Sequence, residues 1–196
     1  MPGLTVWAEA LDGAPSIDME AVRRHDAVVR EAWTRAPACL PVRFGQWLPG
    51  LPELEDSLAE RRDALEQALA RVAGAGEHGL RIAERERPTK PEEDEAPRPS
   101  SGRAYLERVR EKVQAQDEHE RRGAAVARAL EALLEGAIRA QRVDPLPADR
   151  GLVSVSHLVS RERETEYARR VASFREAHPE LDLLTTGPWP PYSFAP

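Results

Sequence analysis

The sequence predicts an α+β fold in two parts, and three observations support this. In several segments apolar residues recur at the spacing of a helix. Shorter segments are rich in β-forming residues, which predicts strands. Charged residues make up 32% of the 196-residue chain and hydrophobic ones 41%, so a core requires the charges to lie on helix surfaces. A Pro-rich acidic stretch then interrupts the pattern. We expect a domain over residues 1–87, a linker over 88–100, and a helical α+β domain over 101–196 with a docked Pro/aromatic tail.

The N-terminal half predicts strands on both sides of one helix. Residues 4–9 are rich in β-formers and predict a short strand. Asp18 can cap a helix that continues to about Thr34. Residues 39–45 predict a second strand, in which Pro41 favours an edge position or a bulge.

A second helix is predicted over residues 54–73, and it is followed by a glycine-rich turn and a strand over residues 79–86. The turn, Gly74 to Gly79, matches the spacing G-x-G-x-x-G. A dinucleotide site needs this pattern after a strand and before a helix, so that phosphate meets the helix N-terminus. Here the order is reversed, which favours a helix cap and turn.

The C-terminal half predicts one long helix, from Gly102 to about Arg142. At a rise of 1.5 Å per residue it would be about 60 Å long. Its middle, residues 114–122, is almost entirely polar, which indicates a segment that projects into solvent or contacts a partner. The remaining predicted elements are a strand over 151–159, a helix over 162–177 and a strand over 181–184.

Charge and composition exclude several classes of function. The formal charge of −6 argues against nucleic acid as the main partner, because phosphate binding needs a positive field. The single cysteine, Cys39, rules out an intramolecular disulfide and fits a reducing cytoplasm. No apolar run approaches the roughly 18 residues of a membrane span. The histidines do not pair at metal-ligand spacing, and His119 lies on a segment expected to be solvated. We expect no catalytic, cofactor or metal site.

The last ten residues before the terminus combine prolines with large aromatic side chains. Pro188, Pro190 and Pro191 forbid a helix. The aromatic rings of the segment carry too much apolar surface to remain in water. They can dock on the N-terminal domain or bind a partner, and docking within the chain avoids most of the entropy lost on association.

This tail, Thr186 to Phe194, resembles the C-terminal signature of the gas-vesicle accessory proteins F and L. Three further parts of the chain resemble the same family, so that the resemblance covers nearly its whole length. They are Arg24–Val29 followed by Cys39–Gly45, then Glu77–Ile82, and then Ser101–Leu106. Because F-type and L-type members share the tail, these motifs do not separate the two types.

The resemblance implies a modified ferredoxin-like N-terminal domain and a C-terminal part made of a long helix with a small strand-helix-strand unit. The family normally opens with a strand of the Tyr-Val-Tyr-Gly type, and the chain lacks a match to it. A ferredoxin-like sheet without that strand would expose an edge beside Val6 and Val42, which would invite association.

The function implied by the resemblance is that of a non-enzymatic accessory or minor structural protein of gas vesicle assembly, in the cytoplasm and on the vesicle. Its implied partners are the small hydrophobic shell protein and other accessory proteins, with neither nucleic acid nor membrane. The residues that match family motifs are candidates for interaction: His25, Pro41, Arg43, Phe44, Gly45, Arg103, Tyr105, Gly187, Pro188, Trp189, Pro190, Pro191, Tyr192 and Phe194.

Two alternatives remain open at the level of sequence. One is a helical adaptor that uses residues 102–142. The other is a small-molecule enzyme or sensor, which would need a pocket with converging polar groups. For Arg43, the alternatives are an ion pair with a carboxylate of the helix near residues 56–66 and a contact to a partner.

Overall fold

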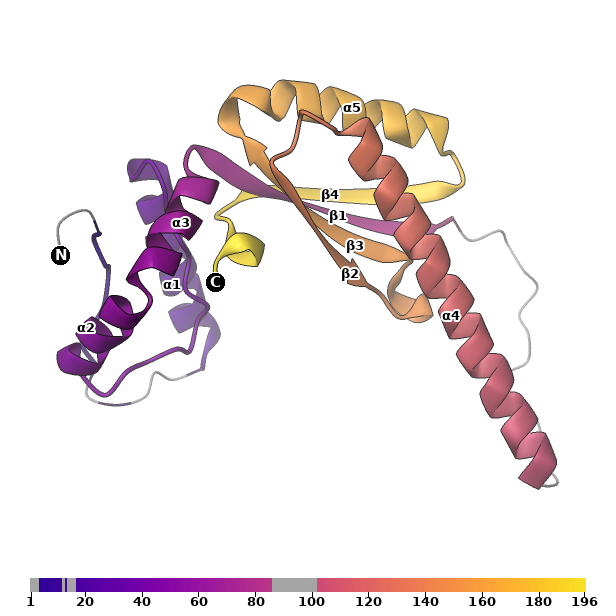
Figure 1. Ribbon diagram of the computed structural model, residues 1–196, viewed down its shortest axis with the longest axis horizontal. Coiled ribbons are helices and arrows are strands. Elements are labelled where there is room, and N and C mark those ends of the chain that lie inside the picture. Colours follow the sequence, from indigo (N-terminus) through magenta and orange to yellow (C-terminus); the bar gives the residue numbers. More distant parts are fainter. Residues whose placement is uncertain (1–3, 12, 14–16, 86–101) are drawn as a thin grey trace. The chain divides into compact units, whose positions relative to one another are not determined.

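The computed structural model describes residues 4–11, 13, 17–85 and 102–196. Helices and an antiparallel sheet confirm the α+β class (Figure 1). By its internal contacts the chain forms two compact units, Met1–Ala73 with Pro190–Pro196 and Gly74–Trp189, which we call unit 1 and unit 2. The expected linker, residues 88–100, lies outside the described residues, so the division at this linker stays a prediction.

Unit 1 is built from three helices, α1 (Met19–Arg35), α2 (Leu51–Glu60) and α3 (Arg62–Val72). The predicted cap of α1 is confirmed, because an Asp18 carboxylate oxygen accepts a hydrogen bond from the Ala21 amide at 2.8 Å. The helix predicted over residues 54–73 is divided at Arg61 into α2 and α3.

The two strands predicted in this half are wrong. Residues 4–9 and 39–45 are both described, and neither is a strand. A strand needs a neighbour to bond its backbone, and the β-segment expected beside them pairs instead with strands of unit 2. The predicted sheet edge beside Val6 and Val42 is therefore absent, although both side chains are exposed.

Unit 2 has the β-α-β-β-α-β order of a ferredoxin-like domain. Its four-stranded antiparallel sheet has the strand order β2-β3-β1-β4. The ferredoxin-like arrangement thus lies in residues 74–189 with four strands, not in the N-terminal half with one missing. Its elements are β1 (Ala75–Glu84), α4 (Gly102–Leu133), β2 (Ala140–Pro145), β3 (Val153–Ser160), α5 (Glu164–Ala177) and β4 (Leu181–Trp189).

Several element bounds differ from the prediction: β1 begins at Ala75 rather than at residue 79, and β2 starts at Ala140, where the sequence predicts a helix. Two further differences have local reasons. The long helix ends at Leu133 rather than near residue 142, and the chain turns at Gly136, whose φ of +76° favours glycine. The last strand continues to Trp189, through Pro188, because β4 is an edge strand and proline is tolerated there.

The core of unit 2 lies between one face of the sheet and the helices α4 and α5. Alternate residues of each strand point to this face, as the two-residue period of a strand requires. Gly123 lets α4 approach closely, since a Cβ there would lie 2.7 Å from the Leu152 carbonyl oxygen. The core side chains include Leu80, Ile82, Leu130, Leu134, Val153, Val155, Tyr167, Val171 and Phe174. None of the helices in the described part of the chain has the length and apolar character of a membrane span.

Candidate functional site

A loop of unit 1 is held on α1 by residues of a family motif. The His25 Nε2 atom lies 2.8 Å from the Val42 carbonyl oxygen, and because a carbonyl only accepts, Nε2 carries the proton. The Phe44 ring packs edge-on against the His25 ring, with centroids 5.6 Å apart. Pro41 is buried, and Gly45 turns the chain at a φ of +88°. These contacts position the loop and the side chains that follow.

The same loop carries large apolar side chains that face solvent. Trp47 is 52% exposed and Leu48 46%, while Val42 before them and Leu51 at the start of α2 are exposed as well. We call these four residues the 42–51 surface. Unit 1 exposes further apolar side chains, among them Val6, Trp7, Leu11 and Val28. Clustered exposed apolar groups are typical of protein-binding surfaces.

The end of the tail docks in unit 1, as the intramolecular interpretation predicts. Pro190, Pro191 and Phe194 are buried, and the Arg71 Nη2 atom donates to the Phe194 carbonyl oxygen at 2.7 Å. Burial, and then the nearby Asp26 carboxylate, raise the pKa of the half-buried Tyr192 hydroxyl. The tail therefore belongs to the packing of unit 1.

The start of the tail has a different place, in β4 of unit 2. Trp189 pairs with Glu77 of β1, after a bulge between Glu77 and Gly79, and its side chain is 39% exposed. Gly187 has a φ of +107°, and a Cβ there would lie 2.6 Å from the Glu77 carbonyl oxygen. Only glycine fits this close approach without strain.

The fourteen candidate residues thus fall into two groups. Arg103 on α4 bonds to Glu107 at 2.9 Å, and Tyr105 on the same helix is exposed, as is Arg43 in unit 1. Unit 1 holds His25, Pro41, Arg43, Phe44, Gly45, Pro190, Pro191, Tyr192 and Phe194, whereas unit 2 holds Arg103, Tyr105, Gly187, Pro188 and Trp189.

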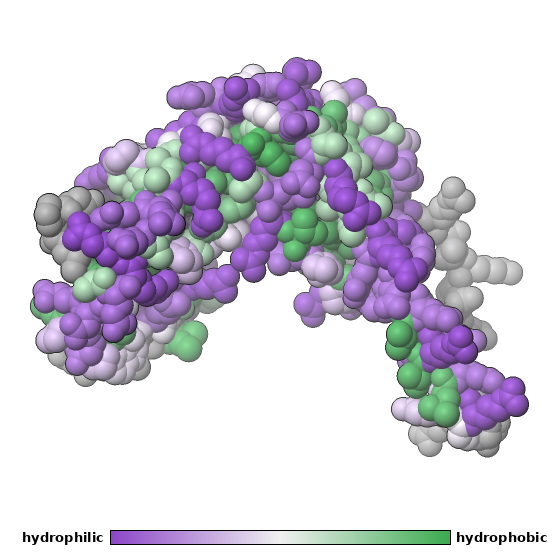
Figure 2. Space-filling view, viewed as in Figure 1, coloured by the Kyte–Doolittle hydropathy of each residue, from purple (hydrophilic) through white to green (hydrophobic). Residues whose placement is uncertain are grey.

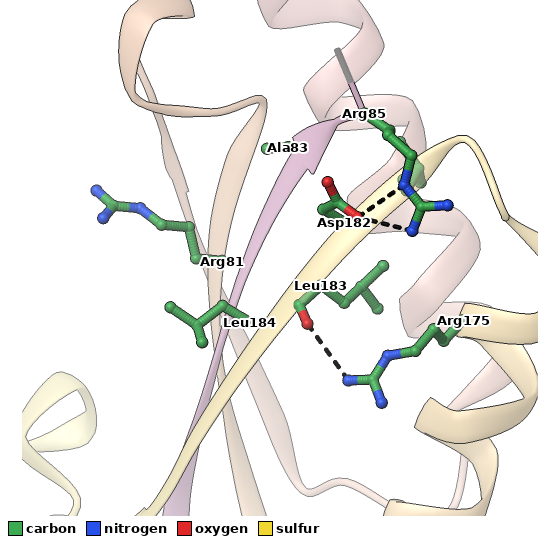
Figure 3. Close-up of a pocket in the computed structure, with 8 residues that line it drawn as sticks. Arg81, Ala83, Arg85, Arg175, Asp182, Leu183 and Leu184 are labelled. Atoms are coloured by element: carbon green, nitrogen blue, oxygen red, sulfur yellow. Dashed lines mark hydrogen bonds and ion pairs between the residues drawn. The ribbon is translucent and has the colours of Figure 1, made fainter. Parts of the chain in front are cut away.

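A hollow of about 290 Å³ lies along β4 (Figure 3). If the protein were a small-molecule enzyme or sensor, polar groups should converge in such a hollow. Arg85 donates to the Asp182 carboxylate at 2.8 and 3.0 Å, and Arg175 donates to the Leu183 carbonyl oxygen. Arg81 extends away from the other two arginines. Arg85 and Arg175 thus bind the protein itself, and the three arginines do not converge on a common point, as an enzyme site would require.

Two histidines of unit 2, His119 and His157, are buried and hydrogen-bonded to the protein itself. His157 is fully buried, with Nδ1 3.0 Å from the Tyr167 hydroxyl and Nε2 2.8 Å from the side-chain amide oxygen of Gln141. The expectation of a solvated His119 is wrong, because it is buried and its Nε2 lies 3.0 Å from the Leu146 carbonyl oxygen. No group of three or more potential metal ligands occurs within the described ranges.

Cys39 does not lie in a strand, although residues 39–45 predict one. It lies in a loop and is half-buried. Burial raises the pKa of its thiol, and a raised pKa makes a thiolate nucleophile less available.

Sequence reasoning missed two parts of the site. Arg71 was not singled out, and only the fold brings it to the tail. The exposed pair Trp47 and Leu48 was missed too, although two large apolar residues in a short Pro/Gly segment without strand or helix pattern were a usable signal.

Comparisons with known proteins point to one family. The model of the family "Gas vesicle synthesis protein GvpL/GvpF" matches residues 5–196. Gas vesicle protein L of Streptomyces sp. (strain CB03234) is 31% identical, over 90% of this chain and 69% of its own length. Gas vesicle protein F of the same strain is 29% identical, over 95% of this chain and 83% of its own.

A solved structure shares the fold. The crystal structure of the gas vesicle protein GvpF from Anabaena sp. PCC7120 matches with a TM-score of 0.70 at 14% sequence identity, covering 96% of this chain and 82% of that one. The family match and the shared fold therefore point to the same family, as do the motif residues of the tail and of the loop on α1. The chain belongs to the GvpL/GvpF family of gas vesicle synthesis proteins, which supports a role in gas vesicle formation.

Proposed function

We propose that this chain is a non-enzymatic accessory or minor structural protein of gas vesicle assembly, acting in the cytoplasm and at the vesicle. In this role it binds the small hydrophobic shell protein, and also other accessory proteins, while vesicles nucleate. The observation that carries the proposal is the 42–51 surface, whose apolar side chains are presented by the motif residues His25, Pro41 and Phe44.

The size of this surface favours a reversible contact. Fully burying an aliphatic side chain is worth about 1.5–3 kcal/mol, so covering a half-exposed one is worth about 1 kcal/mol. Four such side chains give about 4 kcal/mol before the costs of association, which corresponds to weak binding at a single site. Repeated shell subunits would strengthen it through multivalency. A weak contact of this kind can shield a hydrophobic subunit and then release it into the growing shell.

The polar clusters support the non-enzymatic part of the proposal. His157, Tyr167 and Gln141 satisfy one another inside unit 2, and Arg85 is engaged by Asp182. A catalytic constellation needs groups directed at a substrate rather than at each other.

Co-expression with the shell protein of the same gene cluster tests the proposal. We expect this chain to keep the shell protein in the supernatant, and the double variant Trp47→Ser/Leu48→Ser to lose most of that effect. Leu184→Ser is the matched control, because Leu184 is 61% exposed but lies on β4 of unit 2. Equal recovery of shell protein with the double variant and the control would exclude the 42–51 surface. Failure of the unaltered chain would exclude the shell protein as its direct client.

A further inference from the structure

The first half of α4 projects beyond the sheet of unit 2 (Figure 1). Among its described side chains, none before His119 is buried. His119 begins the contact with the rest of unit 2, because its Nε2 lies 3.0 and 3.1 Å from the carbonyl oxygens of Leu146 and Gly151. Residues 102–118 form about 25 Å of helix at 1.5 Å per residue. The described residues of unit 2 therefore bury none of the described side chains along this length of helix.

The projecting helix carries an apolar stripe, visible as green side chains in Figure 2. We call it the α4 stripe, and it consists of Tyr105, Leu106, Val109 and Val113. Leu106 is 66% exposed and Val113 54%. Val109 lies three or four positions from each of the other three residues, so the four share one side of the helix. Isolated helices are marginal in water, and an amphipathic one gains most of its stability by packing its apolar face. The stripe therefore fits a partner.

The charges around the α4 stripe are unevenly placed. At about 100° per residue, Arg103 and Arg110 lie along one border of the stripe and Lys112 along the other. The carboxylates Glu107 and Glu111 fall toward the opposite face, and Glu107 bonds to Arg103 from that side. Asp117 falls on the same border as Arg110, one turn beyond Val113. The stripe is thus bordered by cations along residues 103–113 and by one carboxylate near its end.

We propose that the α4 stripe binds an amphipathic helix of another gas vesicle protein, one whose apolar face is bordered by aspartate and glutamate. The inference rests on the proposed function, since it names the surface through which an accessory partner binds. Apolar contact would cover the stripe, and the partner's acidic borders would face Arg110 and Lys112. Arg110 and Lys112 lie at the edges of such a helix pair, where opposite charges set the choice of partner.

Other occupants fit less well. A second copy of α4 would bring Arg110 and Lys112 toward the same cations of the other copy, with Asp117 alone as a carboxylate at a border, and like charges this close are unfavourable. The chain's own acidic segment, residues 88–100, offers proline and alanine but no leucine, valine or aromatic residue, so it would cover Leu106 and Val109 less fully than an apolar helix face does. A partner helix with its own apolar face and acidic borders fits both features of the stripe best.

Photo-crosslinking in cells that carry the whole gas vesicle gene cluster tests the proposal. A crosslinking amino acid placed at Leu106 should form an adduct, and mass spectrometry should locate it on a partner helix between acidic residues. The same amino acid at Glu111, on the opposite face, is the matched control and should form none. The triple charge reversal Arg103→Glu/Arg110→Glu/Lys112→Glu should lower the adduct about fivefold or more, as expected for three exposed charge pairs.

The outcomes separate this inference from the proposed function. An adduct from Leu106 to a second copy, to the same chain or to the shell protein alone would overturn it, and so would no adduct. An adduct yield that the triple charge reversal leaves unchanged would overturn the proposal that the partner helix has acidic borders. The Tm should stay unchanged in the triple variant, because none of the described side chains of residues 102–118 is buried in a core. If the chain failed to keep the shell protein in the supernatant but the Leu106 adduct still formed, only the proposed contact with the shell protein would be refuted.

Discussion

Acid should weaken the fold of unit 2 through one buried histidine, and the size of the effect follows from its contacts. The Gln141 side-chain oxygen accepts from His157 Nε2, so Nδ1 is unprotonated and accepts from the Tyr167 hydroxyl. A second proton on Nδ1 would break this bond inside the core. Burial, and then the nearby His78, lower the pKa of His157 to about 4. In the unfolded chain the pKa would be about 6.5.

The direction of the effect follows from these two values. Between pH 6.5 and 4 the unfolded chain binds a proton at this position that the folded chain does not, so the free energy of unfolding falls as the pH falls. The stabilisation is fully present above about pH 6.5 and is lost as the pH approaches 4. The difference between the two pKa values corresponds to about 3 kcal/mol of unfolding free energy over the whole window. Between pH 7 and 4.5 the loss is about 2 kcal/mol.

Urea unfolding at pH 7 and at pH 4.5 measures this loss. The unaltered chain should lose about 2 kcal/mol more stability between the two pH values than the variant His157→Gln, which has no titrating group at this position. His178→Gln is the control, because His178 is a more exposed histidine paired with Glu180, and it should keep the full pH dependence. Equal losses in His157→Gln and the unaltered chain, or an NMR titration of His157 near pH 6.5, would refute the reasoning.

Two further predictions concern the tail. Gly187→Ala should lower the free energy of unfolding by about 2 kcal/mol, because Gly187 has a φ of +107° and a Cβ there would lie 2.6 Å from the Glu77 carbonyl oxygen. Gly102→Ala is the control and should not lower it, because a Cβ at Gly102 would have nothing within 4 Å. Phe194→Ala should cost about 3 kcal/mol, since Phe194 is buried, whereas Leu51→Ala, which is 70% exposed, should cost little. Denaturant unfolding measures both, and a Phe194→Ala variant as stable as Leu51→Ala would contradict a docked tail.

Local chemistry made several elements predictable. Asp18 caps α1 because a carboxylate next to a helical pattern accepts the free amides of the first turn. Gly74, with a φ of +64°, ends the second helical region as predicted, but β1 already begins at Ala75, so Gly76 and Gly79 lie in the strand and not in a turn. The tail's rings and prolines pointed to docking, and Phe194 is buried. Each of these features depends on residues close together in the sequence or on one strongly apolar group.

Other features depended on partners far along the chain. His119 sits in a polar run and looks solvated, but the carbonyl oxygens that hold it belong to residues 27 and 32 positions later. Arg71 reaches the tail across 123 positions. No local pattern encodes such contacts.

The sequence by itself determined the α+β class, the helices of unit 1, the strong apolar character of the tail and the family. Only the tertiary structure decided where the ferredoxin-like sheet lies. Residues 4–9 and 39–45 have β-forming composition, yet they remain loops, because β1 takes β3 and β4 as neighbours. The physical reason is that a helix satisfies its backbone within itself, whereas a strand exists only where a second segment, distant in sequence, supplies the other half of its hydrogen bonds.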